Sequence, residues 1–249
     1  MSVPKIDNLR LEVWQKLSVG DRLQSLQNLE NVLAVQEKRE ACTVEFIKDD
    51  QYKSPESRQT MRGTHLHNHI YINEALVNSD KSYKAIYKGE LIEVNPNEPY
   101  MAVETLFHES RHAYQEHISI KDSQKYSDFK MNISKEGYLS KNEFGSLYYR
   151  WQPIEKDANE IARQRTNELY TGEFNDNNYY PNHQKQMDSE VNDDIELAKL
   201  MLGNDYEAKA RQEMISNYNK NRSEELNKTD ELATSESSED LDYYYGYSP

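Results

Sequence analysis

The segment His108-Glu109-Ser110-Arg111-His112 places two histidines four residues apart. Residues four apart lie on the same face of an α-helix, so on a helix both imidazoles can point at one metal ion. Glu109 then stands beside them and can reach a water molecule in an open coordination position of that ion. This pattern constrains the fold, because the segment must be helical and must border a cleft.

The sequence around the two histidines has the periodicity of an amphipathic helix over residues 100–117. Upstream, residues 95–99 have the composition of a helix start, with Asn95 as the cap and proline confined to the first turn. No glycine or proline interrupts residues 100–117. The apolar positions follow a spacing close to 3.6 residues: Val103, Leu106, Phe107, Ala113 and Tyr114. The two histidines flank this apolar stripe, where ligands facing an internal cleft should lie.

A catalytic zinc ion usually takes three protein ligands and keeps a fourth position for water. A second helix is predicted from Pro153 to near Gly172, because proline is favoured at the first helical position and an apolar stripe follows. Glu155 lies in its first turn, 43 residues after His112. The positive end of the helix dipole favours an ionised carboxylate there. Glu160, five residues further along, is the rival ligand, although it can instead pair with Lys156.

An H-E-x-x-H helix followed by a helix carrying E-x-x-A resembles the gluzincin branch of zinc metallopeptidases. The sequence around Glu155 is similar to small zincin domains, intracellular or toxin-associated, of Gram-positive bacteria and their mobile elements. The resemblance covers roughly residues 60–170. It implies one Zn²⁺ per chain held by His108, His112 and Glu155, with Glu109 as the general base.

The function expected from this resemblance is zinc-dependent hydrolysis of peptide bonds in a peptide or protein substrate. Two alternatives stay open: a secreted or injected toxin or effector that uses the same chemistry, and a catalytically silent zincin-like binding module. His183, Tyr148 and Tyr149 are candidates for stabilising the oxyanion. Asp157 and Asn159 are candidates for holding a ligand histidine by a hydrogen bond. The polar residues 121–144 are expected to form a mobile wall over the cleft.

Three further histidines alternate along the chain at His65, His67 and His69. A strand is predicted for residues 66–73. If it begins one residue earlier, at His65, the three histidines would share one face of the strand and could in principle bind a second metal ion. An exposed polar strand face is the favoured interpretation.

Composition limits the partners of the chain. A formal net charge of −14 argues against nucleic acid, whose phosphates would be repelled. The single cysteine, Cys42, excludes an internal disulfide. The N-terminal residues lack a cationic region followed by an apolar run, and no stretch is long and apolar enough to span a membrane. We therefore expect a cytoplasmic protein, or one exported without a signal peptide, with no membrane partner; the oligomeric state is not specified.

The order of predicted elements indicates an α+β, zincin-like fold. Helices at residues 9–17 and 18–33, the second opened by a capping box at Ser18 and Asp21, precede strands at residues 42–46, 66–73 and 83–95. The strands should form a small antiparallel or mixed sheet, followed by the two packed site helices. A single catalytic domain is expected at residues 1–220, with residues 1–60 as a helical N-terminal part.

The last segment of the chain has a different composition. From residue 223 onward there are eight acids and one base, half of the net charge of −14. Such a segment buries too little apolar surface to offset its ordering entropy. Residues 221–249 are therefore predicted to be a disordered acidic tail.

Overall fold

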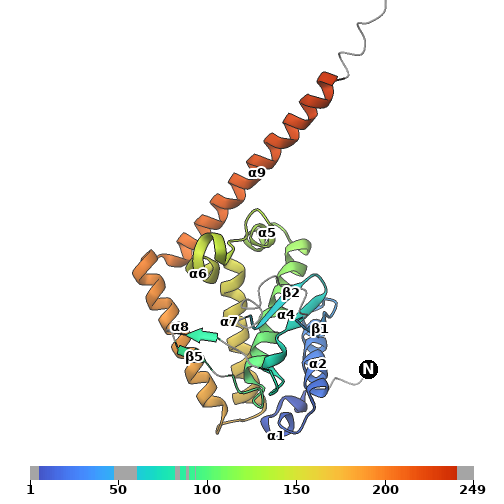
Figure 1. The fold of residues 1–249 in the computed structure, drawn as a ribbon, viewed down its shortest axis with the longest axis vertical. Helices are drawn as coiled ribbons and strands as arrows, with labels where there is room; N and C mark the ends of the chain where they lie inside the picture. Colours follow the sequence, from blue (N-terminus) through green and yellow to red (C-terminus); the bar gives the residue numbers. More distant parts are fainter. Residues whose placement is uncertain (1–5, 48–60, 82–84, 88–89, 93, 240–249) are drawn as a thin grey trace, which may run out of the picture.

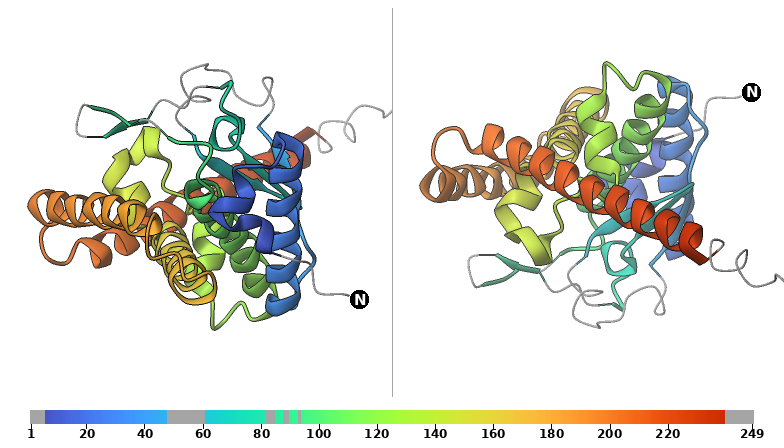
Figure 2. Two further views of the ribbon diagram at one scale, coloured as in Figure 1. Left: turned by 90° about the horizontal axis from the view of Figure 1, so that it is seen from below. Right: turned by 90° about the horizontal axis from the view of Figure 1, so that it is seen from above.

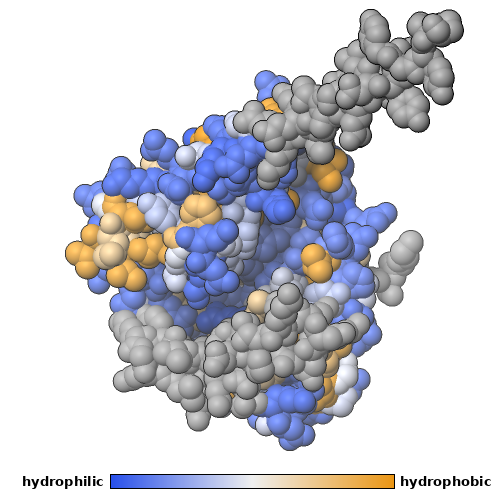
Figure 3. All heavy atoms as spheres, turned by 45° about the horizontal axis from the view of Figure 1, so that its top comes forward, coloured by the Kyte–Doolittle hydropathy of each residue, from blue (hydrophilic) through white to orange (hydrophobic). Residues whose placement is uncertain are grey.

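The computed structural model describes residues 6–47, 61–81, 85–87, 90–92 and 94–239. These residues form helices around a small mixed sheet, so the predicted α+β class is confirmed (Figure 1). Hydrophilic residues dominate the face seen in Figure 3, as expected for a chain of mean hydropathy −1.04. Within the described residues, no helix combines the length and the apolar composition needed to cross a membrane.

The N-terminal region is helical. The 3₁₀-helix η1 (Asp7–Leu9) and the short helix α1 (Leu11–Trp14) replace the single helix predicted for residues 9–17. Helix α2 (Val19–Glu37) begins as predicted, because the Ser18 side chain accepts a hydrogen bond from the backbone N–H of Asp21. It ends where Lys38 adopts the left-handed conformation, at φ 55°.

The main sheet has the strand order β1-β3-β2. Strand β1 (Thr43–Phe46) pairs in parallel with β3 (His69–Ile72), and β2 (Gly63–Leu66) pairs antiparallel with β3. The strand predicted for residues 42–46 is confirmed, whereas the single strand predicted for residues 66–73 is wrong. The chain reverses at His67, whose φ is 55°, and residues 66–73 therefore span the end of β2, a turn and β3.

This reversal separates the three alternating histidines. His65 lies on β2, His67 in the turn and His69 on β3, so the prediction that they share one strand face is wrong. A second short hairpin, β4 (Ala85–Tyr87) and β5 (Glu90–Ile92), takes the place of the strand predicted for residues 83–95. Residues 83–84, 88–89 and 93 of this stretch lie outside the described residues.

The two site helices form where the sequence predicts them. Helix α4 (Tyr100–Lys121) contains the H-E-x-x-H segment, and α7 (Pro153–Asn167) begins at the proline and continues as the π-helix η3 (Glu168–Glu173). Helix α4 packs against α7 on one side and against α2, β2 and β3 on the other (Figures 1 and 2). The main core around α4 includes Trp14, Leu26, Ile70, Ile72, Tyr100, Leu106 and Tyr170.

Helices α5 (Ser127–Ile133) and α6 (Lys141–Trp151) connect α4 to α7, and Gly145 breaks α6 with φ 82°. Helices α8 (Tyr180–Leu202) and α9 (Tyr206–Glu239) are the last elements of the described part of the chain, and a small apolar cluster around Trp151 and Tyr206 joins them to α6.

The prediction that residues 221–249 are disordered is wrong for residues 221–239, which are helical in the structure. Helix α9 continues through the acidic residues and projects from the body (Figure 1), and residues 240–249 lie outside the described residues. Charge favours solvation of this segment, but glutamate, lysine, leucine and alanine are also good helix formers. The division of the chain at residue 220 stays a prediction.

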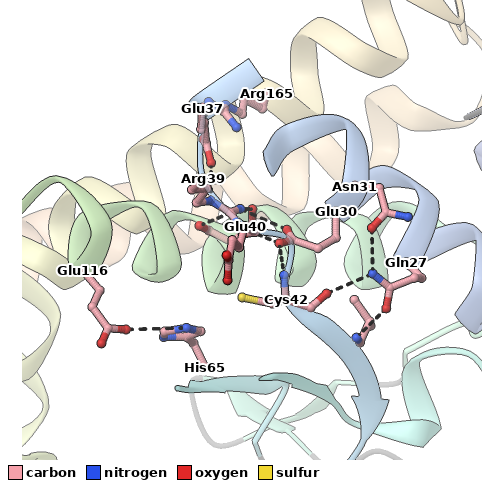
Figure 4. Close-up of polar contacts among 12 residues, drawn as sticks. Gln27, Glu30, Asn31, Glu37, Arg39, Glu40, Cys42, His65, Glu116 and Arg165 are labelled. Atoms are coloured by element: carbon pink, nitrogen blue, oxygen red, sulfur yellow. Dashed lines mark hydrogen bonds and ion pairs between the residues drawn. The ribbon is translucent and has the colours of Figure 1, made fainter. Parts of the chain in front are cut away.

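A buried network of ion pairs and hydrogen bonds connects the C-terminal part of α2 and the residue Arg39 after it to both α4 and α7 (Figure 4). Arg39 donates to both carboxylate oxygens of Glu30, at 2.6 and 3.1 Å, and to the Ser110 hydroxyl of α4 at 2.6 Å. Arg39 also bonds Glu37 at 2.8 Å, and Glu37 pairs with Arg165 of α7 at 2.8 Å. The side chains of Arg39 and Glu30 are 2% and 0% exposed, so neither charge has water as an alternative partner.

Replacing Arg39 should therefore destabilise the protein strongly. In Arg39→Met, Glu30 keeps a buried charge without its partner, and we expect a loss of about 3 kcal/mol or more in the free energy of unfolding. Urea denaturation measures the change. The control is Arg222→Met at an exposed position, which should lower the free energy of unfolding by less than about 0.5 kcal/mol. Equal effects of the two substitutions would contradict this role for Arg39.

Candidate metal centre

Helices α4 and α7 bring three predicted ligands together. The Nε2 atoms of His108 and His112 are 3.1 Å apart. The Glu155 carboxylate lies opposite, with Oε2 3.4 Å from His108 Nε2 and Oε1 3.7 Å from His112 Nε2. Ligand atoms at about 2.0–2.1 Å from a tetrahedral zinc ion are separated by about 3.3 Å, close to these three distances. The donor set and its spacing therefore fit one metal ion.

The rival ligand Glu160 does not join this group. Its carboxylate pairs with Lys156 at 3.3 Å, and its side chain is 51% exposed. Five residues along a helix rotate a side chain well away from the direction of Glu155. In the described part of the chain, the metal-ligating groups that cluster are His108, His112 and Glu155.

The two carboxylates at the site differ in their environment. Burial raises the pKa of Glu109 to about 7, and the Glu155 charge adds to this shift, whereas His112 and a hydrogen bond from the His65 backbone oppose it. Burial also opposes ionisation of Glu155, but His112 and His108 together lower the pKa of this carboxyl. Glu155 is therefore ionised at neutral pH, which is the form that binds a cation.

A chain of hydrogen bonds fixes the orientation of His112. Its Nδ1 lies 2.9 Å from Oε1 of the fully buried Gln115, and Gln115 Nε2 donates to the Ile154 carbonyl at 2.9 Å and to Asp157 at 2.7 Å. With the amide nitrogen engaged in this way, Oε1 can only accept, so His112 Nδ1 donates. His112 Nε2 then keeps its lone pair toward the other ligands, as metal binding requires.

Asp157 and Asn159, the two residues predicted to hold a ligand histidine, make different contacts. Asp157 reaches His112 only through Gln115, and Arg111 holds the Asp157 carboxylate with two hydrogen bonds of 2.6 and 3.0 Å. Asn159 instead donates to the backbone carbonyl of Glu155 at 2.6 Å. Gln115 was missed by sequence reasoning, although its position three residues after His112 places it within reach along the helix.

The three ligands and Glu109 line a cleft of about 400 Å³. Strand β2 forms one wall, and the predicted wall segment, residues 121–144, contributes Ile133 and Tyr138. The remaining lining residues are Met61, Gly63, Thr64, His65, Glu116, Tyr149 and Ile154.

Of the three residues considered as oxyanion donors, only Tyr149 lines this cleft. Tyr148 packs against the apolar cluster around Trp151, and His183 binds Glu104 at 3.1 Å. Tyr138, which the sequence did not single out, lies with its hydroxyl 3.5 Å from Glu155 Oε1. Burial raises the pKa of both Tyr138 and Tyr149 above the ordinary value, so each keeps its proton and can donate.

Strand β2 lies close to α4 at Gly63. A Cβ atom built there would lie 2.7 Å from Thr105 Cγ2, 3.0 Å from the Tyr71 carbonyl and 3.1 Å from Glu109 Cγ. Only glycine allows the strand to lie this close to the helix and to the side chain of Glu109.

Comparisons with protein-family models, with curated proteins and with solved structures find no match to this chain.

Substituting Gly63 should disturb the site from the strand side. Gly63→Ala overpacks the contact with Thr105 and Glu109, and we expect a loss of about 1–3 kcal/mol in the free energy of unfolding. Gly172→Ala is the control, because nothing lies within 4 Å of the added methyl group. Urea denaturation of both variants checks this prediction, which fails if Gly63→Ala is as stable as the unsubstituted chain.

Proposed function

We propose that the chain is a zinc-dependent metallopeptidase with a gluzincin-type ligand set and a zincin-like fold. The observation that carries the proposal is the convergence of His108, His112 and Glu155 around one point, with Glu109 on the same helix in the same cleft. Two imidazoles and one carboxylate are a donor set that suits Zn²⁺ and leaves a fourth position open.

Zinc bound there would act as a Lewis acid and lower the pKa of a bound water toward neutrality. The chain supplies the proton transfers. Glu109, buried in the cleft, accepts a proton from the attacking water and returns it to the leaving amine. We assign the stabilisation of the negative charge that develops on the carbonyl oxygen to Tyr138 and Tyr149, whose hydroxyls line the cleft; the Tyr138 hydroxyl donates to Glu155 in this structure and would have to turn toward the substrate.

A polypeptide substrate is supported by the position of β2. Among the described strands, β2 is an edge strand, which pairs with β3 along one side only. Its residues Gly63, Thr64 and His65 line the cleft. An extended peptide can lie along a sheet edge and form main-chain hydrogen bonds with it. Such a peptide would pass directly beside Glu109 and the three ligands.

The first test of the proposal is metal content. The purified chain should carry about one Zn²⁺ per molecule, since three ligands define one site. His108→Ala and His112→Ala should each lose the metal, as measured by mass spectrometry. His117→Ala on the same helix is the control and should keep it. Full retention of zinc in the double variant lacking His108 and His112 would refute the ligand assignment.

A second test separates the general base from the ligands. Glu109→Gln should keep the zinc, because Glu109 is not a ligand, and should lower the rate of peptide cleavage about 10²–10⁴-fold. The measurement is digestion of a broad peptide library, with Glu160→Gln as the control of equal charge change. Zinc binding without turnover in the unsubstituted chain would instead identify a binding module, and loss of zinc in Glu109→Gln would give Glu109 a structural role.

A further inference from the structure

The cleft contains a buried polar atom that the catalytic scheme does not use. His65 extends from β2 into the cleft, and its side chain is only 10% exposed. Among the described residues, its Nε2 atom has no hydrogen-bond partner. Buried polar side-chain atoms are nearly always hydrogen-bonded, so an unpartnered one that faces a cleft points to a ligand.

The chemistry of the His65 ring specifies what that ligand must offer. Burial lowers the pKa of His65 to about 4, so the ring is neutral at neutral pH. The ring also hydrogen-bonds the backbone of His67, an interaction that raises the pKa and is therefore donated by the ring. Since Nε2 has no partner, Nδ1 is the donor, and Nε2 is left as an acceptor.

A second acceptor lies beside the first. Glu116, one turn after His112 on α4, places its Oε2 3.9 Å from His65 Nε2 (Figure 4). The Glu116 side chain is 44% exposed at the edge of the cleft. Because the His65 ring is neutral, it does not compensate the charge of the Glu116 carboxylate.

We propose that His65 and Glu116 form a subsite for a cationic group of the substrate, an ammonium or a guanidinium. A carboxylate and an imidazole lone pair that face the same space can both accept hydrogen bonds from such a group. An acidic group there would be repelled by Glu116, and an apolar group would leave both acceptors without partners. The net charge of −14 also attracts cationic peptides toward the molecule.

This subsite rests on the proposed peptidase function, and its test uses the zinc-loaded full chain. The substrates are peptides that differ only by lysine, norleucine or glutamate at positions around the cleaved bond, each with a free and an acetylated N-terminus. Lysine should raise kcat/KM about tenfold over norleucine, as expected for a hydrogen bond to a charged group. Persistence of the preference in acetylated peptides assigns the cation to a side chain, and its loss on acetylation assigns it to the terminal amine.

Variants of Glu116 show whether the preference comes from this subsite. Glu116→Gln should remove it, and Glu116→Arg should shift it toward glutamate. Glu196→Gln changes the charge equally on an exposed part of α8 outside the cleft and should leave the preference intact.

Three outcomes would overturn the subsite while leaving the peptidase function standing: cleavage with equal kcat/KM for lysine and norleucine, a preference that survives Glu116→Gln, and a preference lost in Glu196→Gln. If the zinc-loaded chain cleaves none of these peptides and none of a broad library, the proposed function fails and the subsite fails with it.

Discussion

The register between α4 and α7 is the constraint on which the candidate metal centre depends. Gln115 of α4 sets this register. Its amide nitrogen donates hydrogen bonds to the Ile154 carbonyl and to Asp157 of α7, and its amide oxygen accepts a hydrogen bond from His112 Nδ1. A shift of one residue along α7 would rotate Glu155 by about 100° and remove it from the two histidines. On the opposite side of α4, Arg39 holds Ser110, so the site helix is fixed from both faces.

The parts of this arrangement that follow from local sequence could be predicted. Helix periodicity and the proline at position 153 located both site helices, and the spacing of four residues put His108 and His112 on one face. The position of Glu155 in the first turn of α7 separated it from Glu160. These features need only the geometry of one helix, which the sequence specifies directly.

The parts of the arrangement that depend on tertiary contacts could not be predicted from the sequence. His67 adopts a left-handed conformation that is uncommon for a residue other than glycine, so a hairpin occupies a stretch predicted to be one strand. Tyr138 enters the cleft because of how α5 and the loop after it lie against α7, and no local pattern marks it. The paired roles of His65 and Glu116 arise from β2 and α4 meeting across the cleft, 51 residues apart in sequence.

The separation of the ligands along the chain has a mechanical consequence. His112 and Glu155 are 43 residues apart, and the segment between them contains α5 and α6. An ion held by both would act as a removable cross-link that closes this loop and restricts the unfolded chain. Chelation would then reopen the loop, and the unfolding of α5 and α6 would lose part of its coupling to that of α4. Metal supply would in this way govern the susceptibility of the connecting segment to proteolysis as well as the chemistry of the cleft.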